Sequence, residues 1–543
     1  MPAPEPAAAR LRLAAATLAL AVGFFVHARA WVFVCDDAFI SFRYARNLAR
    51  FGALEYNLGE RVEGYTNFLW VLVLGLGDRL GVAPEDAAPV LTAVGAAVLV
   101  VAATRLLRGL RGRASAAWSV GDLAPAALMI AAPEVMVWSQ GGLETSCAAA
   151  LALLAMDAWL AARPRRAALF AALAGLTRAD VLVAVAAFGL AWLALAGVAA
   201  ARGDRRGDAE GSRLRARAIA EAALVFAALI GGHLIFRRLY YGAWLPNTWT
   251  VKAHGALLRG TFGVDYLRAW AENLGLVYAA PLLALARARH LVVAAPIAAA
   301  AAYAWSVGGD FMAYSRFLLV ATALVAVLVA WLLADAGERL GARWPRLRGA
   351  GGVVALAFAA ALASGARARW AADRAKPAGW IDGRWEGVTA MDRFARERLH
   401  VGAWMREHLP GDTLITVGAA GAMPYTSELP TVDVFGLVDP TIADLPEVRP
   451  RTGEGARPGH QLYAPRAYIR ARDPDLLCHA GYVGERRPSP ALARRRGYAG
   501  MVWACVEPGP VADPREPDGV LDLGFYCCLR PRDRAVGPFG AEP

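Results

Sequence analysis

Two neighbouring acids, Asp36 and Asp37, directly follow the first apolar stretch of the sequence. Adjacent carboxylates can take a proton from a hydroxyl group as a general base, and they equally suit a divalent cation. Further polar residues follow in the same loop: Glu60, Glu63, Tyr65 and Asn67. A helix N-terminal acid would explain one carboxylate, but not the pair together with this cluster. The pattern therefore favours catalysis at the edge of an apolar region.

Three later segments between apolar blocks carry residues of the same kinds. Their candidate substrate-binding and phosphate-binding residues are Glu144, Asn247, Lys252, His254, Asp310 and Arg316. Lys252 stands out because the chain has one other lysine, Lys376, and a compact ammonium suits a phosphate contact. Plainer roles stay open for two of these segments. Glu144 could be a helix N-terminal acid, and Asp310 could pair with Arg316 only to tie its loop.

The residues after Asp37 predict an amphipathic helix. Its apolar stripe consists of Ile40, Tyr44, Leu48 and Phe51. Arg43, Arg46 and Arg50 lie on another face, so we expect the helix to rest flat on a membrane surface. Arg43 and Arg46 are candidate contacts for a donor phosphate, with phospholipid headgroups as the alternative partners.

The composition is that of a polytopic α-helical membrane protein. The 543 residues are 57% hydrophobic, with a mean hydropathy of +0.38. Apolar blocks of about 16 to 22 residues have the length that crosses a bilayer. The expected spans are residues 12–33, 86–105, 118–138, 143–162, 166–177, 180–200, 218–236, 272–287, 290–306, 316–334 and 350–366.

Arginine-rich loops predict the orientation of these spans. They lie at residues 105–113, 163–166, 202–217, 287–289 and 339–348, and positive loops favour the cytoplasm. All fall on one side if residues 68–80 form a helix on the outer face, which gives about eleven spans with the N-terminus inside. The net charge of +12 is thus a topology signal, and no nucleic-acid partner is expected. As an alternative for the first span, Ala28–Ala30 resembles a signal-peptide cleavage site.

The chain divides into residues 1–369, a transmembrane catalytic domain, and residues 370–543, an extracytoplasmic α/β domain. In the tail, β runs at Thr413–Val417 and Val432–Leu437 flank a Gly-rich turn that lacks a phosphate-loop lysine. Four cysteines lie in this tail, and Cys478 could pair with Cys505 or Cys527. Their spacing does not suit a zinc site, and the sequence leaves the connectivity open.

The motifs DDAFISFRYARNLA, ERVEGYTNFLW, GGLET, LPNTWTVK and GGDFMAYSRFL, in this order, resemble a bacterial group of GT-C superfamily glycosyltransferases. Among characterised enzymes the pattern is similar to mycobacterial terminal arabinofuranosyltransferases. More distantly, the paired acids resemble those of protein O-mannosyltransferases and lipid A aminoarabinose transferases. The resemblance covers residues 12–335, and RPGH at Arg457–His460 resembles a tail motif of the group.

The resemblance implies a GT-C membrane domain and a polyprenyl-phosphate-linked sugar as donor. It implies a catalytic acid in the first outer loop, with Asp36 first and Asp37 second, because Asp37 stands where the distant relatives have Glu. The expected function is transfer of a sugar to an extracytoplasmic glycan, lipid or protein at a bacterial inner membrane. The alternative is a transporter or flippase of lipid-linked sugars, against which the scarcity of charge in the middles of the spans argues.

Overall fold

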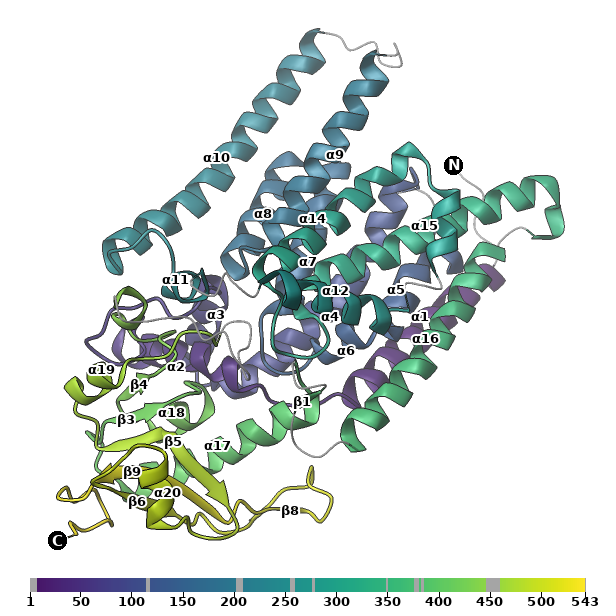
Figure 1. Cartoon of the computed structure of the whole chain (residues 1–543). Helices are drawn as coiled ribbons and strands as arrows, with labels where there is room; N and C mark the ends of the chain where they lie inside the picture. The colour runs from purple at the N-terminus through teal and green to yellow at the C-terminus, as the bar shows by residue number, and fades with distance from the viewer. Residues whose placement is uncertain are drawn as a thin grey trace.

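A computed structural model of the chain describes residues 7–113, 118–201, 209–253, 259–275, 279–347, 350–375, 380–381, 385–445 and 460–542. Within these ranges a helical membrane domain is followed by a smaller α/β domain, as the sequence predicts (Figure 1). The tail domain lies against one end of the helices, and the N-terminus lies far from it.

Seven of the described helices are long and apolar enough to cross a membrane, so the chain is a multi-pass membrane protein. They belong to α1 (Ala7–Arg29), α4 (Pro84–Leu110), α9 (Val181–Ala201), α10 (Ala209–Tyr240), α14 (Leu291–Val307), α15 (Leu319–Arg343) and α16 (Ala350–Ala375). The spanning stretch of α15 is 78% buried inside the protein, which makes it the centre of the bundle. By contrast α9 and α10 are largely uncovered, and both project away from the tail domain.

Shorter elements replace several predicted spans. Residues 118–138 form a 3-10 turn (Val120–Leu123), α5 (Ala124–Ala131) and α6 (Pro133–Val137), because the residue before a proline avoids helical geometry. The predicted spans at 143–162 and 166–177 correspond to α7 (Thr145–Leu160) and α8 (Pro164–Thr177).

The predicted span at residues 272–287 needs correction. In the described residues α12 (Arg259–Asn273) ends before Gly275, whose φ is +58°, and a 3-10 helix at Ala280–Leu285 follows. A left-handed glycine and a proline near the start of the 3-10 helix interrupt this stretch, although its apolar composition alone predicts one continuous helix.

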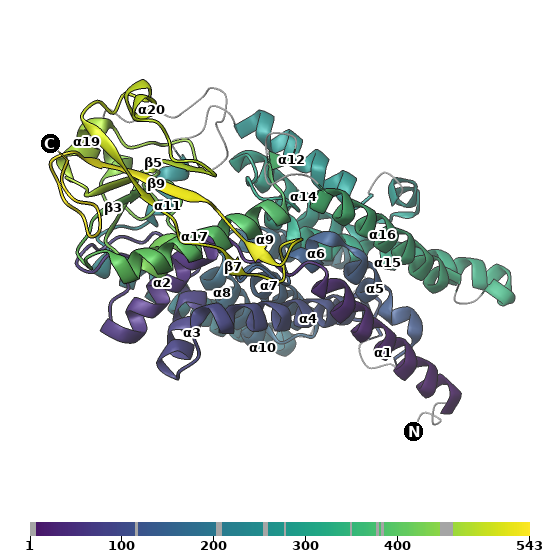
Figure 2. The same cartoon turned by 90° about the horizontal axis from the view of Figure 1, so that it is seen from below.

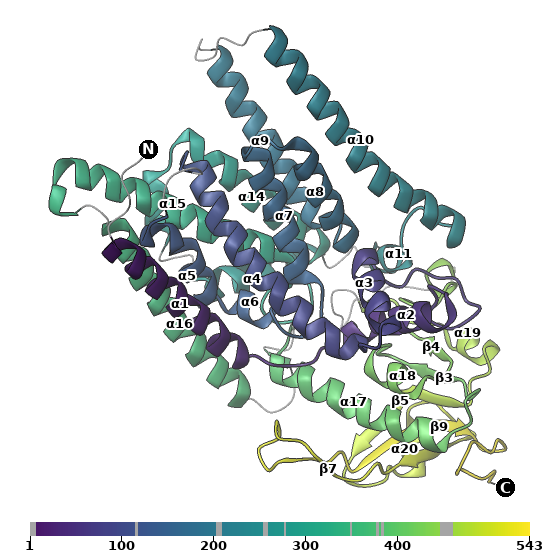
Figure 3. The same ribbon diagram turned by 180° about the vertical axis from the view of Figure 1, so that it is seen from behind.

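Two helices lie between the bundle and the tail domain. They are α2 (Asp36–Phe51) and α3 (Phe68–Arg79), and the second of these is the segment predicted not to cross (Figure 3). Its 12 residues span about 18 Å, well short of a hydrocarbon core of about 30 Å. The apolar stripe of α2 is covered mainly by protein, with Ile40 and Tyr44 buried and only Phe51 exposed.

The tail domain is built on a mixed five-stranded sheet of order β4-β3-β5-β9-β6. The strands are β3 (Ile415–Val417), β4 (Thr431–Asp433), β5 (Leu476–Gly484), β6 (Met501–Val506) and β9 (Phe525–Pro531). β3 runs parallel to β4 and β5, and β9 runs antiparallel to β5 and β6. The two predicted β runs are therefore confirmed as neighbouring strands.

Helices cover the sheet on the side of the membrane domain. The long α17 (Val388–His408) packs on α18 (Ala422–Ser427), and both contact α2 (Figure 2). Further tail elements are α19 (Arg466–Ala471), α20 (Pro490–Arg495) and the short pairs β1–β2 (380–381, 385–386) and β7–β8 (511–512, 520–521). The helix α11 (Asn247–Ala253) belongs to the membrane domain and docks on the tail. The acidic loop, which is the segment at Asp36 and Asp37 for which the sequence predicts catalysis, thus lies at the joint between the two domains.

Two disulfides tie the last strand to its neighbours. Cys528 pairs with Cys478 of β5, and Cys527 pairs with Cys505 of β6. Neither pairing named from the sequence is formed, because Cys505 and Cys527 are directly opposed in the antiparallel ladder. Cys35 and Cys147 are free thiols.

Candidate functional site

Asp36 and Asp37 form the first turn of α2 and line a cavity of about 480 Å³. Its walls come from both domains: the loop around Met312, α17, the turn at residues 417–419, and the strands β5 and β9. The strand-like residue Val34 aims the acids into it, because its amide donates to Asp392 of α17 (2.9 Å) and its backbone bridges to Gly141. The two predicted catalytic acids therefore line a partly open cavity that the tail domain completes.

Asp36 is held on the tail-domain side of this cavity. Its Oδ1 accepts a hydrogen bond from the Ala422 amide (2.9 Å), at the first turn of α18. The preceding residue must be glycine, because a Cβ on Gly421 would lie 2.0 Å from the Asp36 carbonyl oxygen. The Gly-rich turn predicted in the tail therefore packs directly against the backbone of the acidic loop.

Asp37 lies among charges of the membrane domain. Burial raises the pKa of its carboxyl, while the positive charges of Arg316 and Lys252 lower it. Asp310 and Glu144 raise the pKa further through their negative charges. The structure thus places four other predicted site residues, from three separate segments, within electrostatic range of the Asp37 carboxylate.

The Asp310–Arg316 ion pair is formed, with both side chains buried. Gly309 has a φ of +72°, and a Cβ there would overlap the Tyr266 ring at 2.4 Å, so the turn before Asp310 requires glycine. Trp138 donates its indole N–H to the Tyr314 carbonyl (2.8 Å) and fixes the same loop from the side. The pair therefore holds a rigid loop beside Asp37.

Lys252 reaches the site from α11, which is docked on the tail domain. Its neighbour Val251 is buried in a tail cluster with Val434 and Ile442, whereas Lys252 itself is exposed. The Asn247 side-chain amide donates to the carbonyls of Gly436 (2.7 Å) and Leu437 (3.0 Å). Asn247 is thus a structural clamp that positions the lysine. His254 lies outside the described residues.

Sequence reasoning missed Arg178, which stands between α8 and α9. Its guanidinium bonds Glu144 (3.0 Å) and Asp180 (2.8 Å), and the other Glu144 oxygen accepts from Asn67 (2.7 Å). Asn67 also exchanges hydrogen bonds with Ser41 of α2. A charged Arg-Ala-Asp turn between two outer helix ends is the signal that could have revealed it.

Arg43 and Arg46 have their donors directed elsewhere. Arg43 is buried and donates to the carbonyls of Tyr56 (2.8 Å), Pro424 (2.8 Å) and Leu429 (2.9 Å). Arg46 stacks on the Tyr425 ring at 3.5 Å. It also pairs with Glu85 and Glu428 at 3.4 and 3.3 Å. These contacts join α2 to α18 and the turn that follows it, so both arginines belong to the interdomain joint.

Glu63 and Tyr65 instead contact the C-terminal end of α10, within the membrane domain. Glu63 is paired with Arg237 (3.1 Å), and the Tyr65 hydroxyl meets that of Tyr241 (3.0 Å). His460 does line the cavity, edge-on to Phe311 and Phe435. In the part of the chain that the structure describes, no group of three His, Cys, Asp or Glu residues could hold a metal ion.

Comparison with known proteins places the fold. A family described as a domain of unknown function (DUF8728) matches residues 388–508, within the tail. A terminal beta-(1->2)-arabinofuranosyltransferase of Mycobacterium tuberculosis is 31% identical over 262 residues, which cover 45% of this chain and 38% of that protein.

Two crystal structures of ArnT from Cupriavidus metallidurans resemble the whole chain. The apo structure has a TM-score of 0.58 at 13% identity, covering 96% of this chain and 98% of ArnT. The structure bound to undecaprenyl phosphate has a TM-score of 0.55 at 12% identity, covering 95% and 97%. The chain therefore has the fold of ArnT, a helical membrane domain followed by a C-terminal α/β domain, and the fold predicted from the sequence is confirmed.

Proposed function

We propose that this chain is a membrane glycosyltransferase that transfers a sugar from a polyprenyl-phosphate donor to an extracytoplasmic acceptor. The observation that carries the proposal is the pair of acids on the wall of a cavity shared by both domains, with Lys252 and Arg316 acting on the second acid. Support also comes from the ArnT fold, solved with undecaprenyl phosphate, and from the arabinofuranosyltransferase match.

The two acids take different tasks in this proposal. Asp36, on the tail-domain side, accepts the proton of the acceptor hydroxyl, and the oxygen of that hydroxyl bonds to the anomeric carbon of the sugar. The bond from that carbon to the phosphate oxygen breaks, and the lipid phosphate leaves with the electron pair. Lys252 and Arg316 stabilise the leaving phosphate, and Asp37 keeps both cations oriented.

The helix α2, which begins with the two acids, and the tail domain lie at the same end of the helix bundle (Figure 3). Together with the arginine-rich loops of the sequence, this supports a site on the periplasmic or extracellular side of the membrane. Donor and acceptor would then meet at headgroup depth. The movement of a lipid-linked sugar without bond formation is the competing function, and it predicts no transferred product.

The direct test is Asp36→Asn in membranes supplied with a lipid-linked radiolabelled sugar and cell-envelope glycan. Loss of the proton acceptor is expected to lower transfer by about 100-fold or more, in line with general base contributions. Asp412→Asn, which neutralises an exposed acid of the tail, is the matched control and keeps full transfer. Undiminished transfer by a normally inserted Asp36→Asn protein would remove Asp36 from the mechanism.

A further inference from the structure

The wall of the cavity opposite the membrane domain is not used by donor chemistry. It combines flat rings with polar atoms, in the residues Phe394, Arg398, Phe435, His460, His479 and Tyr526. They come from α17, the turn after β4, the loop before α19, and the strands β5 and β9. A volume of about 480 Å³ falls within the range of pockets that enclose small-molecule ligands.

Arg398 is fixed within this wall by two aromatic rings. Its guanidinium carbon lies 4.4 Å from the centre of the Phe394 ring and 4.9 Å from that of Tyr526. Its Nη1 is buried and has no hydrogen-bond partner among the described residues, and the carboxylate of Glu397 is 3.7 Å away. A buried donor without a partner is costly, so this atom is suited to an oxygen supplied by a ligand.

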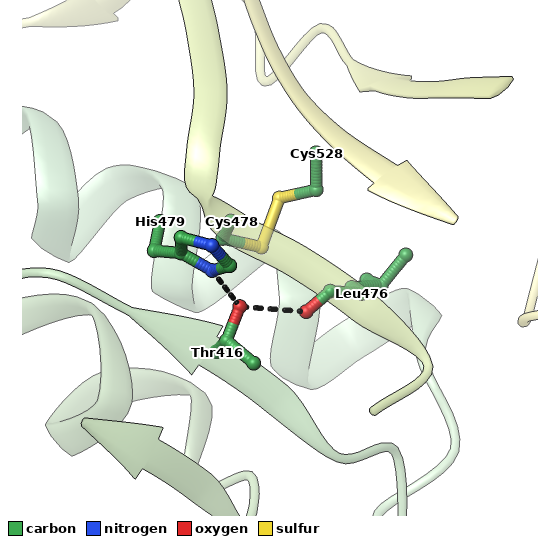
Figure 4. Close-up of a disulfide and its surroundings, with 5 residues drawn as sticks. All are labelled: Thr416, Leu476, Cys478, His479 and Cys528. Carbon is green, nitrogen blue, oxygen red and sulfur yellow. Dashed lines mark hydrogen bonds between the residues drawn. A yellow bond between two sulfur atoms is a disulfide. The ribbon is translucent and has the colours of Figure 1, made fainter. Parts of the chain in front are cut away.

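His479 is held equally firmly (Figure 4). Its Nδ1 is hydrogen-bonded to the Thr416 hydroxyl and its Nε2 lies 3.3 Å from the Tyr498 hydroxyl. The adjacent Cys478 is tied by its disulfide to Cys528 on β9, the strand that also carries Tyr526. Burial lowers the pKa of His479 to about 4, so the ring is neutral at physiological pH.

The wall also reaches the catalytic acid and the membrane domain. The pKa of Tyr526 is raised by burial, lowered by the charge of Arg398 and raised by that of Asp36. The tyrosine thus lies within electrostatic range of both residues. His460 packs edge-on between Phe311 of the membrane domain (4.5 Å) and Phe435 of the tail (5.0 Å). A ligand on this wall would therefore present its end to Asp36.

These features fit a saccharide better than a lipid or a peptide. A sugar ring has apolar faces that stack on aromatic rings and hydroxyl groups around its edge for fixed donors and acceptors. Asp36 and Asp37 at the inner end disfavour an anionic acceptor, and Arg398 alone among the wall residues carries a fixed positive charge.

We propose that this wall is the acceptor subsite, and that the acceptor is the end of a neutral oligosaccharide chain. The inference rests on the proposed glycosyl transfer and names its acceptor class. Preorganised rings and a preoriented guanidinium reduce the entropy that a flexible glycan end loses on binding.

The test measures saccharide binding and acceptor kinetics on the full chain in lipid nanodiscs. The probes are arabino-, manno-, galacto- and gluco-oligosaccharides. Their binding is measured by saturation-transfer NMR in the absence of donor. One of them is expected to bind, and Arg398→Gln and Phe435→Leu are each expected to weaken that binding about tenfold. Arg406→Gln, an exposed arginine of the same helix α17, is the matched control and binds as the unmodified chain does.

With donor present, Arg398→Gln is expected to raise the KM for the oligosaccharide about tenfold. The control Arg406→Gln is expected to keep both this KM and the slow hydrolysis of the donor by water. Absence of binding for every saccharide would overturn the acceptor subsite. Saccharide binding and KM in Arg398→Gln and Phe435→Leu that equal those of the unmodified chain would overturn it too. Saccharide binding by a chain that neither transfers nor hydrolyses the donor would instead refute the proposed transferase function and leave the subsite standing.

Discussion

Two sets of cations near the acidic loop behave differently in the structure, although the sequence assigns them one role. Arg43 and Arg46 of α2 direct their donors to backbone carbonyls and carboxylates of the joint. Lys252 and Arg316 surround the carboxylate of Asp37 instead. Arg43 holds structure, because its guanidinium donates to fixed protein oxygens of the joint. The exposed ammonium of Lys252 can turn to a ligand, and the buried Arg316, paired with Asp310, acts through its charge.

The largest expected effect breaks the joint. Arg43→Met removes three buried hydrogen bonds from a charged donor, and each such bond contributes about 1.5 to 3 kcal/mol. We expect the unfolding free energy to fall by several kcal/mol and the tail to become sensitive to protease, measured by thermal unfolding and limited proteolysis in detergent.

Arg50→Met is the matched control for Arg43. Arg50 lies on the same helix, is 47% exposed and makes one ion pair with Glu428, so its loss should cost at most about 1 kcal/mol. Equal melting temperatures for Arg43→Met and the unmodified chain would show that the joint does not depend on these bonds.

A smaller effect, on activity alone, is expected at the cavity. Lys252→Met removes a cation from the leaving phosphate and should reduce transfer about 10- to 100-fold, equivalent to about 1.4 to 2.7 kcal/mol. Because Lys252 is exposed, the melting temperature should not change. Arg268→Met, at an exposed arginine of α12, should leave both quantities unaltered. An unchanged donor affinity and transfer rate in Lys252→Met would show that Lys252 does not contribute to donor binding.

The smallest expected effect is a pH dependence of donor affinity, which comes from the acids around Lys252 and Arg316 and therefore sharpens the comparison. The negative charges of Asp37, Asp310 and Glu144 are balanced by Lys252, Arg316 and Arg178, so a bound anion adds an unpaired negative charge and is favoured when one acid is neutral. The pKa of Asp37 is already raised, and a nearby phosphate raises it further, so binding takes up a proton. Affinity for a singly charged polyprenyl phosphodiester should therefore fall as pH rises through that pKa, by at most about tenfold per pH unit.

Titration calorimetry between pH 5 and 8 measures this linkage. Asp37→Asn should bind with little dependence on pH and more tightly than the unmodified chain at pH 8. Asp412→Asn, at an exposed tail residue, should retain the slope. An unchanged slope in Asp37→Asn would assign the proton to another group.

Local signals were sufficient for the main plan of the molecule. Apolar blocks located most membrane helices, because a bilayer imposes a length and a composition that can be counted along the chain. The β runs around the Gly-rich turn became β3 and β4. The prediction of a span at residues 272–287 was wrong, because Gly275 and Pro281 interrupt an apolar stretch that hydropathy alone does not divide.

The sequence by itself determined a membrane domain with an α/β tail and placed two acids directly after the first span. Only the tertiary structure decided which partners each charge meets. Arg43 finds the carbonyls of Pro424 and Leu429 more than 370 residues away, Arg398 lines the same cavity as Asp36 from another domain, and Cys528 pairs with Cys478. These choices depend on distances through space between remote segments, and no local spacing encodes them.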